Sequence, residues 1–202
     1  MAFSPTATVA LPSGQERADR LVDAARLLAN QTGTAAFTVA EVVEQAGASL
    51  KGFYRSFAGK DDLLVALLAA DSRVGAGLLA ELVEGHDSPE RRLRAFVEGI
   101  FALVTLPGAT GYAGVLVREH RRLLEDRPDA LRQALSPLID LLATEIAAAS
   151  GAGVATSTDA IRDASTVFAL LLAGIHDVTV GADPDEVAGH LWRFCWHGLQ
   201  AR

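Results

Sequence analysis

The chain has 202 residues, of which 50% are hydrophobic and 21% are charged, and its formal net charge is −7. This composition is typical of a soluble globular protein, and the negative charge argues against a protein that coats nucleic acid through general positive charge. The single cysteine, Cys195, excludes an intramolecular disulfide and fits a cytoplasmic location.

Residues 1–14 are expected to form a flexible tail, because Pro5, Pro12 and Gly14 stand there among several serines and threonines. The segment lacks the basic start and apolar stretch of a signal peptide. The longest apolar runs, such as 167–175, are far shorter than the roughly 20 residues that span a bilayer. We therefore expect no association with a membrane.

After the tail, the sequence predicts an all-α fold of about nine helices, because alanine and leucine dominate and β-branched alternation is scarce. Gly33 is expected to end the first helix. Thr38 and Glu41 form a capping-box pattern before the second, and Ser49 is expected to cap the third. The first four helices are expected over 15–32, 39–46, 50–56 and 60–85.

Five more helices follow Gly85. Ser88 and Pro89 are a strong helix start, and either Thr158 or Asp159 is expected to cap a later helix. These helices are expected over 89–106, 109–124, 128–149, from the cap at 158 or 159 to 181, and 184–200. The layout predicts a small domain at 15–62 and a larger one at 63–202.

Residues 38–57 predict a helix-turn-helix motif, because two short helices flank a glycine turn at Gly47. The second helix is about two turns long and carries Lys51, Tyr54 and Arg55. Such a helix fits the major groove of B-DNA, which is about 12 Å wide. The only two lysines of the chain, Lys51 and Lys60, lie on either side of Arg55, and this local positive charge suits contact with phosphates.

The pattern of this segment is distinctive. It consists of Thr38-Val39-Ala40-Glu41-Val42, Ala46-Gly47, Ser49, Phe53-Tyr54-Arg55-x-Phe57 and Lys60-Asp61-x-Leu63. In these residues the chain resembles the tetracycline-repressor (TetR) family of bacterial transcription regulators. The resemblance implies a dimer with an N-terminal helix-turn-helix that binds DNA and a C-terminal helical domain that senses a small molecule.

The resemblance also implies roles for single residues. The residues that would contact phosphates are Thr38, Tyr54 and Lys60, and Arg55 belongs to the same DNA-contacting set. The residues expected to face the groove are Ser49, Leu50, Lys51 and Gly52. The chain departs from the family where Leu50 replaces a common basic residue, Lys51 a common glycine and Gly52 a common threonine or alanine. Leu50 would suit a thymine methyl group, so the operator sequence stays open.

The last two expected helices are apolar on two faces, and a helix of this kind must bury both faces. We expect one face to meet the core and the other to meet a second copy of the chain across a two-fold axis. The alternative is a single thick monomer core. The expected interface residues are Ile161, Ala164, Phe168, Leu171, Val187, Leu191, Phe194, Cys195, Trp196 and Leu199.

An effector pocket is expected among the fourth to eighth helices. Its expected lining is Phe96, Phe101, Tyr112, Leu116, Phe168, Leu172 and Ile175, with His120 and His176 as polar members. The apolar bias of this set favours a hydrophobic or aromatic effector. The chain is thus expected to be a repressor that a small molecule releases from a palindromic operator.

No catalytic site, metal site or cofactor is expected. Gly151 and Gly153 lack the third glycine and the preceding strand of a phosphate loop, and the adjacent pair Glu119 and His120 would point in different directions on a helix. The alternative function is a helical small-molecule-binding protein or enzyme whose helix-turn-helix no longer reads DNA. A DNA contact would explain the set of Lys51, Tyr54, Arg55 and Lys60 jointly, and the alternative would not.

Overall fold

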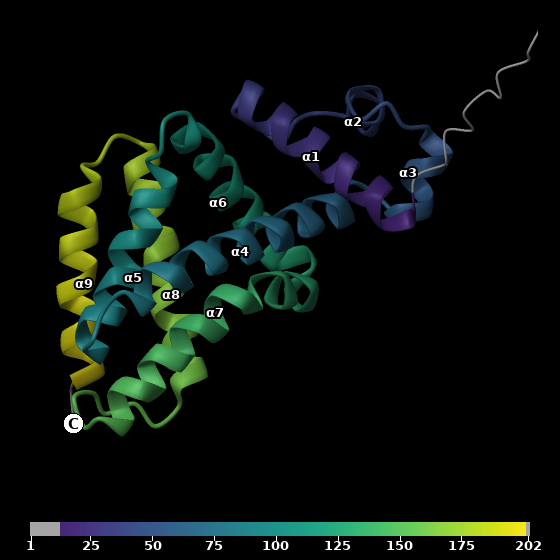
Figure 1. Cartoon of the computed structure of the whole chain (residues 1–202). Coiled ribbons are helices and arrows are strands. Elements are labelled where there is room, and N and C mark those ends of the chain that lie inside the picture. Colours follow the sequence, from purple (N-terminus) through teal and green to yellow (C-terminus); the bar gives the residue numbers. More distant parts are fainter. Residues whose placement is uncertain (1–12, 201–202) are drawn as a thin grey trace, which may run out of the picture.

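A computed structural model describes residues 13–200, and within this range the chain forms nine α-helices and no strand (Figure 1). The prediction of an all-α fold with about nine helices is confirmed. The helices are α1 (Gly14–Thr32), α2 (Val39–Gln45), α3 (Leu50–Ser56), α4 (Lys60–Glu84), α5 (Pro89–Val104), α6 (Ala109–Asp126), α7 (Pro128–Gly151), α8 (Ala160–Thr179) and α9 (Pro184–Gln200).

Side-chain caps fix several helix starts at the positions that the sequence indicates. Thr38 forms a capping box with Glu41, Ser49 accepts a hydrogen bond from the Gly52 amide, and Ser88 precedes Pro89 at the start of α5. Of the two candidate caps for α8, the structure uses Asp159.

The expected tail at 1–14 lies outside the described residues except for its last two. Ser13 caps α1 through a capping box with Glu16, and Gly14 is the first residue of that helix. The expected tail was therefore two residues too long at its C-terminal end.

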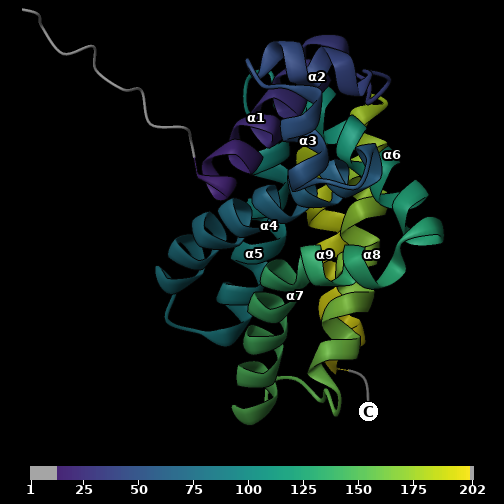
Figure 2. The same ribbon diagram turned by 90° about the vertical axis from the view of Figure 1, so that its right-hand side faces the viewer.

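The helices form a small head and a larger body (Figures 1 and 2). Helices α1, α2 and α3 make the head at one end of the molecule, and α4 runs from the head into the body formed by α5 to α9. Helices α8 and α9 lie side by side in the body. This arrangement leaves the head exposed on most sides.

Helix α4 belongs to both hydrophobic cores. Its first half places Leu63 and Leu67 in the head core beside Phe53, whereas its second half places Leu79 and Val83 in the body core. The chain therefore has no structural break at the expected boundary between residues 62 and 63, because one continuous helix crosses it.

Helices α4 and α7 are each long and apolar enough to cross a membrane by length and composition. The sequence analysis expected no membrane-spanning segment because it considered only uninterrupted apolar runs. Hydropathy averaged over a whole helix gives this different result. In the structure α4 and α7 pack against each other, and their apolar residues enter the two cores.

Close packing of α8 on its neighbours requires a glycine at position 174. A Cβ atom there would lie 2.5 Å from Leu191 Cδ1 and 2.9 Å from Phe101 Cζ. We expect Gly174→Ala to lower the free energy of unfolding by about 1–3 kcal/mol through overpacking. Urea unfolding measures this effect.

The matched control is Gly77→Ala on α4, where a new Cβ meets no atom within 4 Å. This change is expected to stabilise the protein by about 0.5–1 kcal/mol, because alanine restricts the unfolded chain more than glycine does. Equal effects of the two substitutions would contradict the packing described here.

Candidate DNA-binding surface and effector cavity

Helix α3 divides into a buried and an exposed side. Phe53 is fully buried in the head core, and its ring packs against Phe57 at a centroid distance of 5.7 Å. On the other side Leu50 is 53% exposed and Tyr54 61% exposed, and Lys51 is exposed beside them. Large apolar side chains at the surface of such a small head indicate a surface that contacts another molecule.

Arg55 is exposed near the end of α3, and the Tyr54 ring stands edge-on to Phe53 at 5.2 Å. The Tyr54 ring thus rests on the core while most of its side chain faces solvent. Lys51 and Arg55 add two positive charges to the same helix, which is the arrangement required to meet a polyanion.

Gly52 does not lie on the exposed surface, contrary to the expectation that it faces the groove. It is buried, and a Cβ atom at this position would lie 3.2 Å from Ser49 Oγ and 3.3 Å from Arg17 Cδ. Gly52 therefore allows α1 to approach α3 closely.

Two of the expected DNA contacts also hold the local backbone. The Ser49 hydroxyl accepts a hydrogen bond from the Gly52 amide at 3.0 Å. The Thr38 hydroxyl donates to Glu41 Oε2 at 2.8 Å and accepts from the Glu41 amide at 3.2 Å. Both side chains are exposed and fix the N-termini of α2 and α3.

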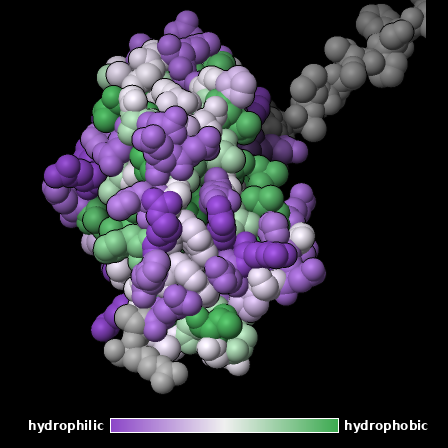
Figure 3. Space-filling model, turned by 90° about the vertical axis from the view of Figure 1, so that its left-hand side faces the viewer, coloured by the Kyte–Doolittle hydropathy of each residue, from purple (hydrophilic) through white to green (hydrophobic). Residues whose placement is uncertain are grey.

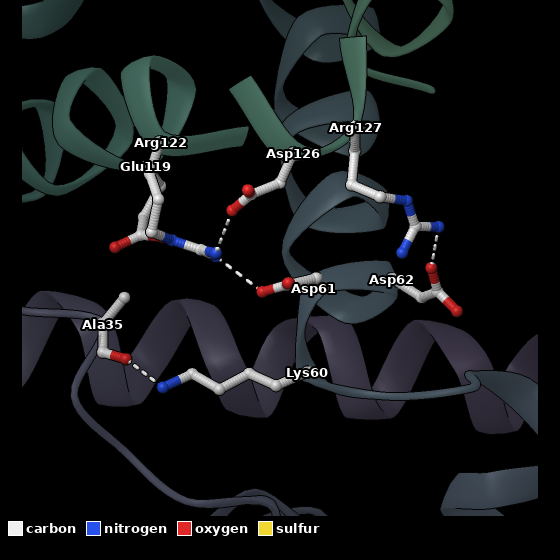
Figure 4. Close-up of polar contacts among 8 residues, drawn as sticks. All are labelled: Ala35, Lys60, Asp61, Asp62, Glu119, Arg122, Asp126 and Arg127. Atoms are coloured by element: carbon white, nitrogen blue, oxygen red, sulfur yellow. Dashed lines mark hydrogen bonds and ion pairs between the residues drawn. The ribbon is translucent and has the colours of Figure 1, made fainter. Parts of the chain in front are cut away.

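The ammonium group of Lys60 is engaged inside the head, which the sequence did not indicate. It donates a hydrogen bond to the Ala35 carbonyl (Figure 4) and lies 4.8 Å from the centroid of the Phe37 ring. The cation therefore ties the start of α4 to the loop between α1 and α2. Lys60 is half-buried, and its expected contact with a phosphate stays a prediction.

Ion pairs join the start of α4 to the body at the turn between α6 and α7 (Figure 4). Arg122 bonds Asp61 at 2.6 Å, and Arg127 pairs with Asp62. A third link runs from Arg118 to the Gly33 carbonyl at 2.7 Å. The head is thus attached to α6 by polar contacts near the surface.

These attachments are expected to be weak. Hydrogen bonding by Arg122 lowers the pKa of Asp61, so this ion pair stabilises the fold above the ordinary pKa of an aspartate and is lost as the pH falls through the lowered value. We expect Arg122→Ala to reduce the free energy of unfolding by less than about 1 kcal/mol at neutral pH, because both side chains are partly exposed.

Thermal unfolding of the wild type and of Arg122→Ala at neutral and at acidic pH measures this effect. The difference between the two proteins should vanish once Asp61 is protonated. A large difference that persists in acid would show that Arg122 acts through packing instead.

A cavity of about 670 Å³ lies between α4, α5, α6, α7 and α8 and reaches α1. Of the residues expected from the sequence, its lining contains Tyr112, Leu116, His120, Phe168, Leu172 and Ile175. Val74 and Leu78 line it and are also exposed, so they mark its opening.

Three expected lining residues lie elsewhere. Phe96 is fully buried in the body core and Phe101 is buried beside α8, because both point into the packing between α5 and its neighbours. His176 is exposed near the end of α8 and does not line the cavity. A helical stripe predicts the buried side of a helix, but it does not distinguish a filled core from a cavity wall.

Sequence reasoning named Tyr112 but missed the charged residues beside it in the cavity wall. Arg26 of α1 bonds Asp71 of α4, with Arg26 Nε 3.0 Å from Asp71 Oδ1, and also pairs with Asp23. Tyr112 of α6 donates its hydroxyl to Asp71 Oδ2 at 2.5 Å. Burial, with Asp71 nearby, raises the pKa of Tyr112, so the phenol stays protonated and donates.

This group joins the head helix α1 to α4 and α6 at the cavity wall. The signal available in the sequence was an arginine and an aspartate on the inner sides of two amphipathic helices, 45 residues apart. Only the fold brings them together.

The outer side of α8 and α9 differs from the expected interface. Half of the expected residues are buried within the subunit: Ala164, Phe168, Leu171, Cys195 and Trp196. Trp196 stacks on Trp192 at 5.3 Å, and burial raises the pKa of the Cys195 thiol, which stays protonated.

The exposed members of that set are Ile161 and Phe194, and Val187, Leu191 and Leu199 are half-buried. Phe194 is 61% exposed and borders two hollows, one of about 350 Å³ between α8 and α9 and one beside His190 and His197. Figure 3 shows hydrophilic side chains down the middle of the face that carries α9, with smaller hydrophobic patches around them. The face is therefore mixed, and Phe194 is its large exposed aromatic residue.

The head is the part of the chain that a family model matches. Residues 21–67, which span α1, α2, α3 and the start of α4, match the family model described as bacterial regulatory proteins of the tetR family. The head of the chain belongs to this family. No curated protein matches it.

Solved structures of other proteins share the fold over most of the chain. The regulator FadR from Bacillus subtilis, solved with stearoyl-CoA, is 16% identical with a TM-score of 0.73 over 89% of this chain and 98% of its own. RolR, solved with resorcinol, is 18% identical with a TM-score of 0.70 over 94% and 90%. NemR from E. coli is 18% identical with a TM-score of 0.65 over 87% and 95%. The chain thus shares the fold of these proteins, with a helix-turn-helix head and a helical body.

Proposed function

We propose that the chain is a repressor that binds a palindromic DNA operator as a homodimer and leaves it when a small, mainly apolar effector binds. The observation that carries the proposal is the exposed side of α3, where Leu50, Lys51, Tyr54 and Arg55 face solvent from a helix of two turns. The dimensions of such a helix suit the major groove. A small-molecule-binding protein that does not read DNA has no use for this surface.

The two proposed functions are assigned to the two parts of the chain that contain the two hydrophobic cores. The DNA-binding part is the head, expected at 15–62, and the ligand-binding and dimerisation part is the body, expected at 63–202. The outer side of α8 and α9 is the proposed dimer face, because Phe194 and Ile161 are exposed there. A two-fold axis at this face would set two heads about one DNA turn apart, roughly 34–36 Å.

The cavity is the proposed effector site. FadR was solved with stearoyl-CoA and RolR with resorcinol, so proteins of this fold accommodate ligands with apolar parts. An effector at the cavity wall would disturb the link from Arg26 to Asp71 and Tyr112, and with it the position of the head. A coupling free energy of about 1–3 kcal/mol would change DNA affinity roughly 5- to 150-fold.

Gel shifts with DNA fragments from upstream of its own gene, followed by footprinting, test the proposal. We expect one fragment to bind, with two protected half-sites about 10 base pairs apart or a multiple of that distance. Failure to bind any fragment or any duplex selected from a random pool would refute the DNA-binding assignment.

A further inference from the structure

Ser72 supplies an unused hydroxyl group at the effector cavity. It lies on α4, lines the cavity and is 3% exposed, and its Oγ has no hydrogen-bond partner within residues 13–200. Serines in helices commonly bond the carbonyl four residues back, as Ser165 does with Ile161 at 2.8 Å. A buried hydroxyl without a partner is unfavourable unless a bound molecule satisfies it.

His120 supplies a second unused polar group. It lies half-buried on α6, lines the same cavity and makes no hydrogen bond to another described side chain or backbone group. Burial lowers the pKa of this histidine, so its imidazole is neutral at neutral pH. A neutral imidazole has one donor and one acceptor nitrogen, and both are open to a ligand.

The charged groups of the cavity are already paired. Arg26 bonds both Asp71 and Asp23, and the second oxygen of Asp71 accepts the Tyr112 hydroxyl. An anionic ligand would therefore meet two carboxylates and a cation that is already occupied. A cationic ligand would find both oxygens of Asp71 engaged, and in either case the lost hydration would not be replaced.

The remaining wall is apolar. Leu103, Phe168 and Leu172 lie in the lining, and the exposed Val74 and Leu78 mark an apolar opening. This wall would bury the hydrocarbon part of a ligand and offers that part no hydrogen-bond partner.

We propose that the cavity binds an uncharged ligand with an apolar body and one hydroxyl group, such as an alkylphenol, and that Ser72 and His120 bind the hydroxyl. The inference rests on the proposed function in taking the cavity as the effector site. The unused polar groups are neutral and the charged ones are occupied, and this contrast selects an uncharged ligand.

A matched series of compounds tests the chemistry at neutral pH by isothermal titration calorimetry on the full chain. The series is 4-hexylphenol, hexylbenzene, 4-hexylbenzoate and 4-hexylbenzylammonium, with 4-butyl- and 4-octylphenol to cover differences in length. We expect 4-hexylphenol to bind roughly 3- to 10-fold more tightly than hexylbenzene and at least about tenfold more tightly than either ion. Equal or tighter binding of an ion would overturn the proposal.

Three variants assign the contacts. Ser72→Ala and His120→Phe should each reduce the preference for 4-hexylphenol over hexylbenzene. The matched control is Ser150→Ala on α7, whose Oγ is also buried without a partner but lies outside this cavity, and it should keep the preference. Without ligand, Ser72→Ala should unfold at the wild-type temperature or above, because the hydroxyl it removes makes no bond. A preference that survives both cavity substitutions would overturn the assignment.

DNA binding by the same preparations separates this inference from the proposed function. A protein that binds its operator and none of the compounds would keep the regulator assignment and overturn the ligand class. A protein that binds 4-hexylphenol through Ser72 and His120 but no duplex would keep the ligand class and overturn the regulator assignment.

Discussion

Lys51→Ala is expected to weaken operator binding by roughly 30-fold or more, because each dimer loses two contacts and a contact of this kind contributes about 1–3 kcal/mol. Lys51 is exposed on α3 beside Leu50 and Tyr54, and the buried Phe53 on the opposite side keeps the helix in place. Removing an exposed ammonium group should therefore leave the fold intact. Fluorescence anisotropy with a labelled operator measures the affinity, and circular dichroism confirms the helical content.

The salt dependence of binding shows which kind of contact is lost. If Lys51 meets phosphates, the substitution should weaken binding to all duplexes and reduce the salt slope by about 2 per dimer. If it meets a base, the loss should be confined to the correct operator.

The control is Arg132→Ala on α7, which removes one exposed positive charge far along the chain from α3. It should leave DNA binding unchanged. Tyr54→Phe removes only a hydroxyl group and should have a smaller effect than Lys51→Ala. Wild-type affinity in both head variants would show that α3 is not the DNA-contacting helix.

The sequence was sufficient for the parts of this protein that depend on local signals. Capping residues such as Thr38, Ser49 and Ser88 and the punctuating Gly33 locate helix ends within a few residues. The spacing within 38–57 was enough to predict the helix-turn-helix. Both kinds of signal act over a few residues, so they can be read without knowing the fold.

Tertiary contacts were harder to predict. No local pattern predicts that the cation of Lys60 meets Ala35 and Phe37, or that Gly52 is buried under Arg17. Nor does any such pattern show that Asp71 would join Arg26 to Tyr112, because these residues come from three helices. An apolar stripe on a helix predicts that its side chains are buried. Only the fold shows whether such a side chain packs in the core, lines a cavity or contacts a partner subunit.

The dimer interface illustrates this point and leads to the second large expected effect. Trp196 is one of the expected interface residues on α9, but the structure buries it against Trp192. A charge at position 196 would therefore unfold the subunit rather than separate two copies, because an unpaired carboxylate would enter the core. The residue that can test the interface is Phe194, which is exposed on the proposed dimer face.

Phe194→Glu is expected to convert the dimer into folded monomers. Two-fold symmetry places both copies of the new carboxylate in the interface, where each replaces a large aromatic side chain, so the dissociation constant of the dimer should rise at least about 100-fold. Sedimentation velocity measures the mass, and circular dichroism should show unchanged helical content. DNA binding should weaken in parallel, because a single head loses the second half-site.

Leu124→Glu on α6 is the matched control, since Leu124 is an exposed apolar residue outside the proposed dimer face. This variant should sediment as a dimer and bind DNA like the wild type. A dimer that persists in Phe194→Glu would place the interface on another face of the body. The heads would then be spaced by a different axis, and the half-site separation found by footprinting would have to be explained from that axis.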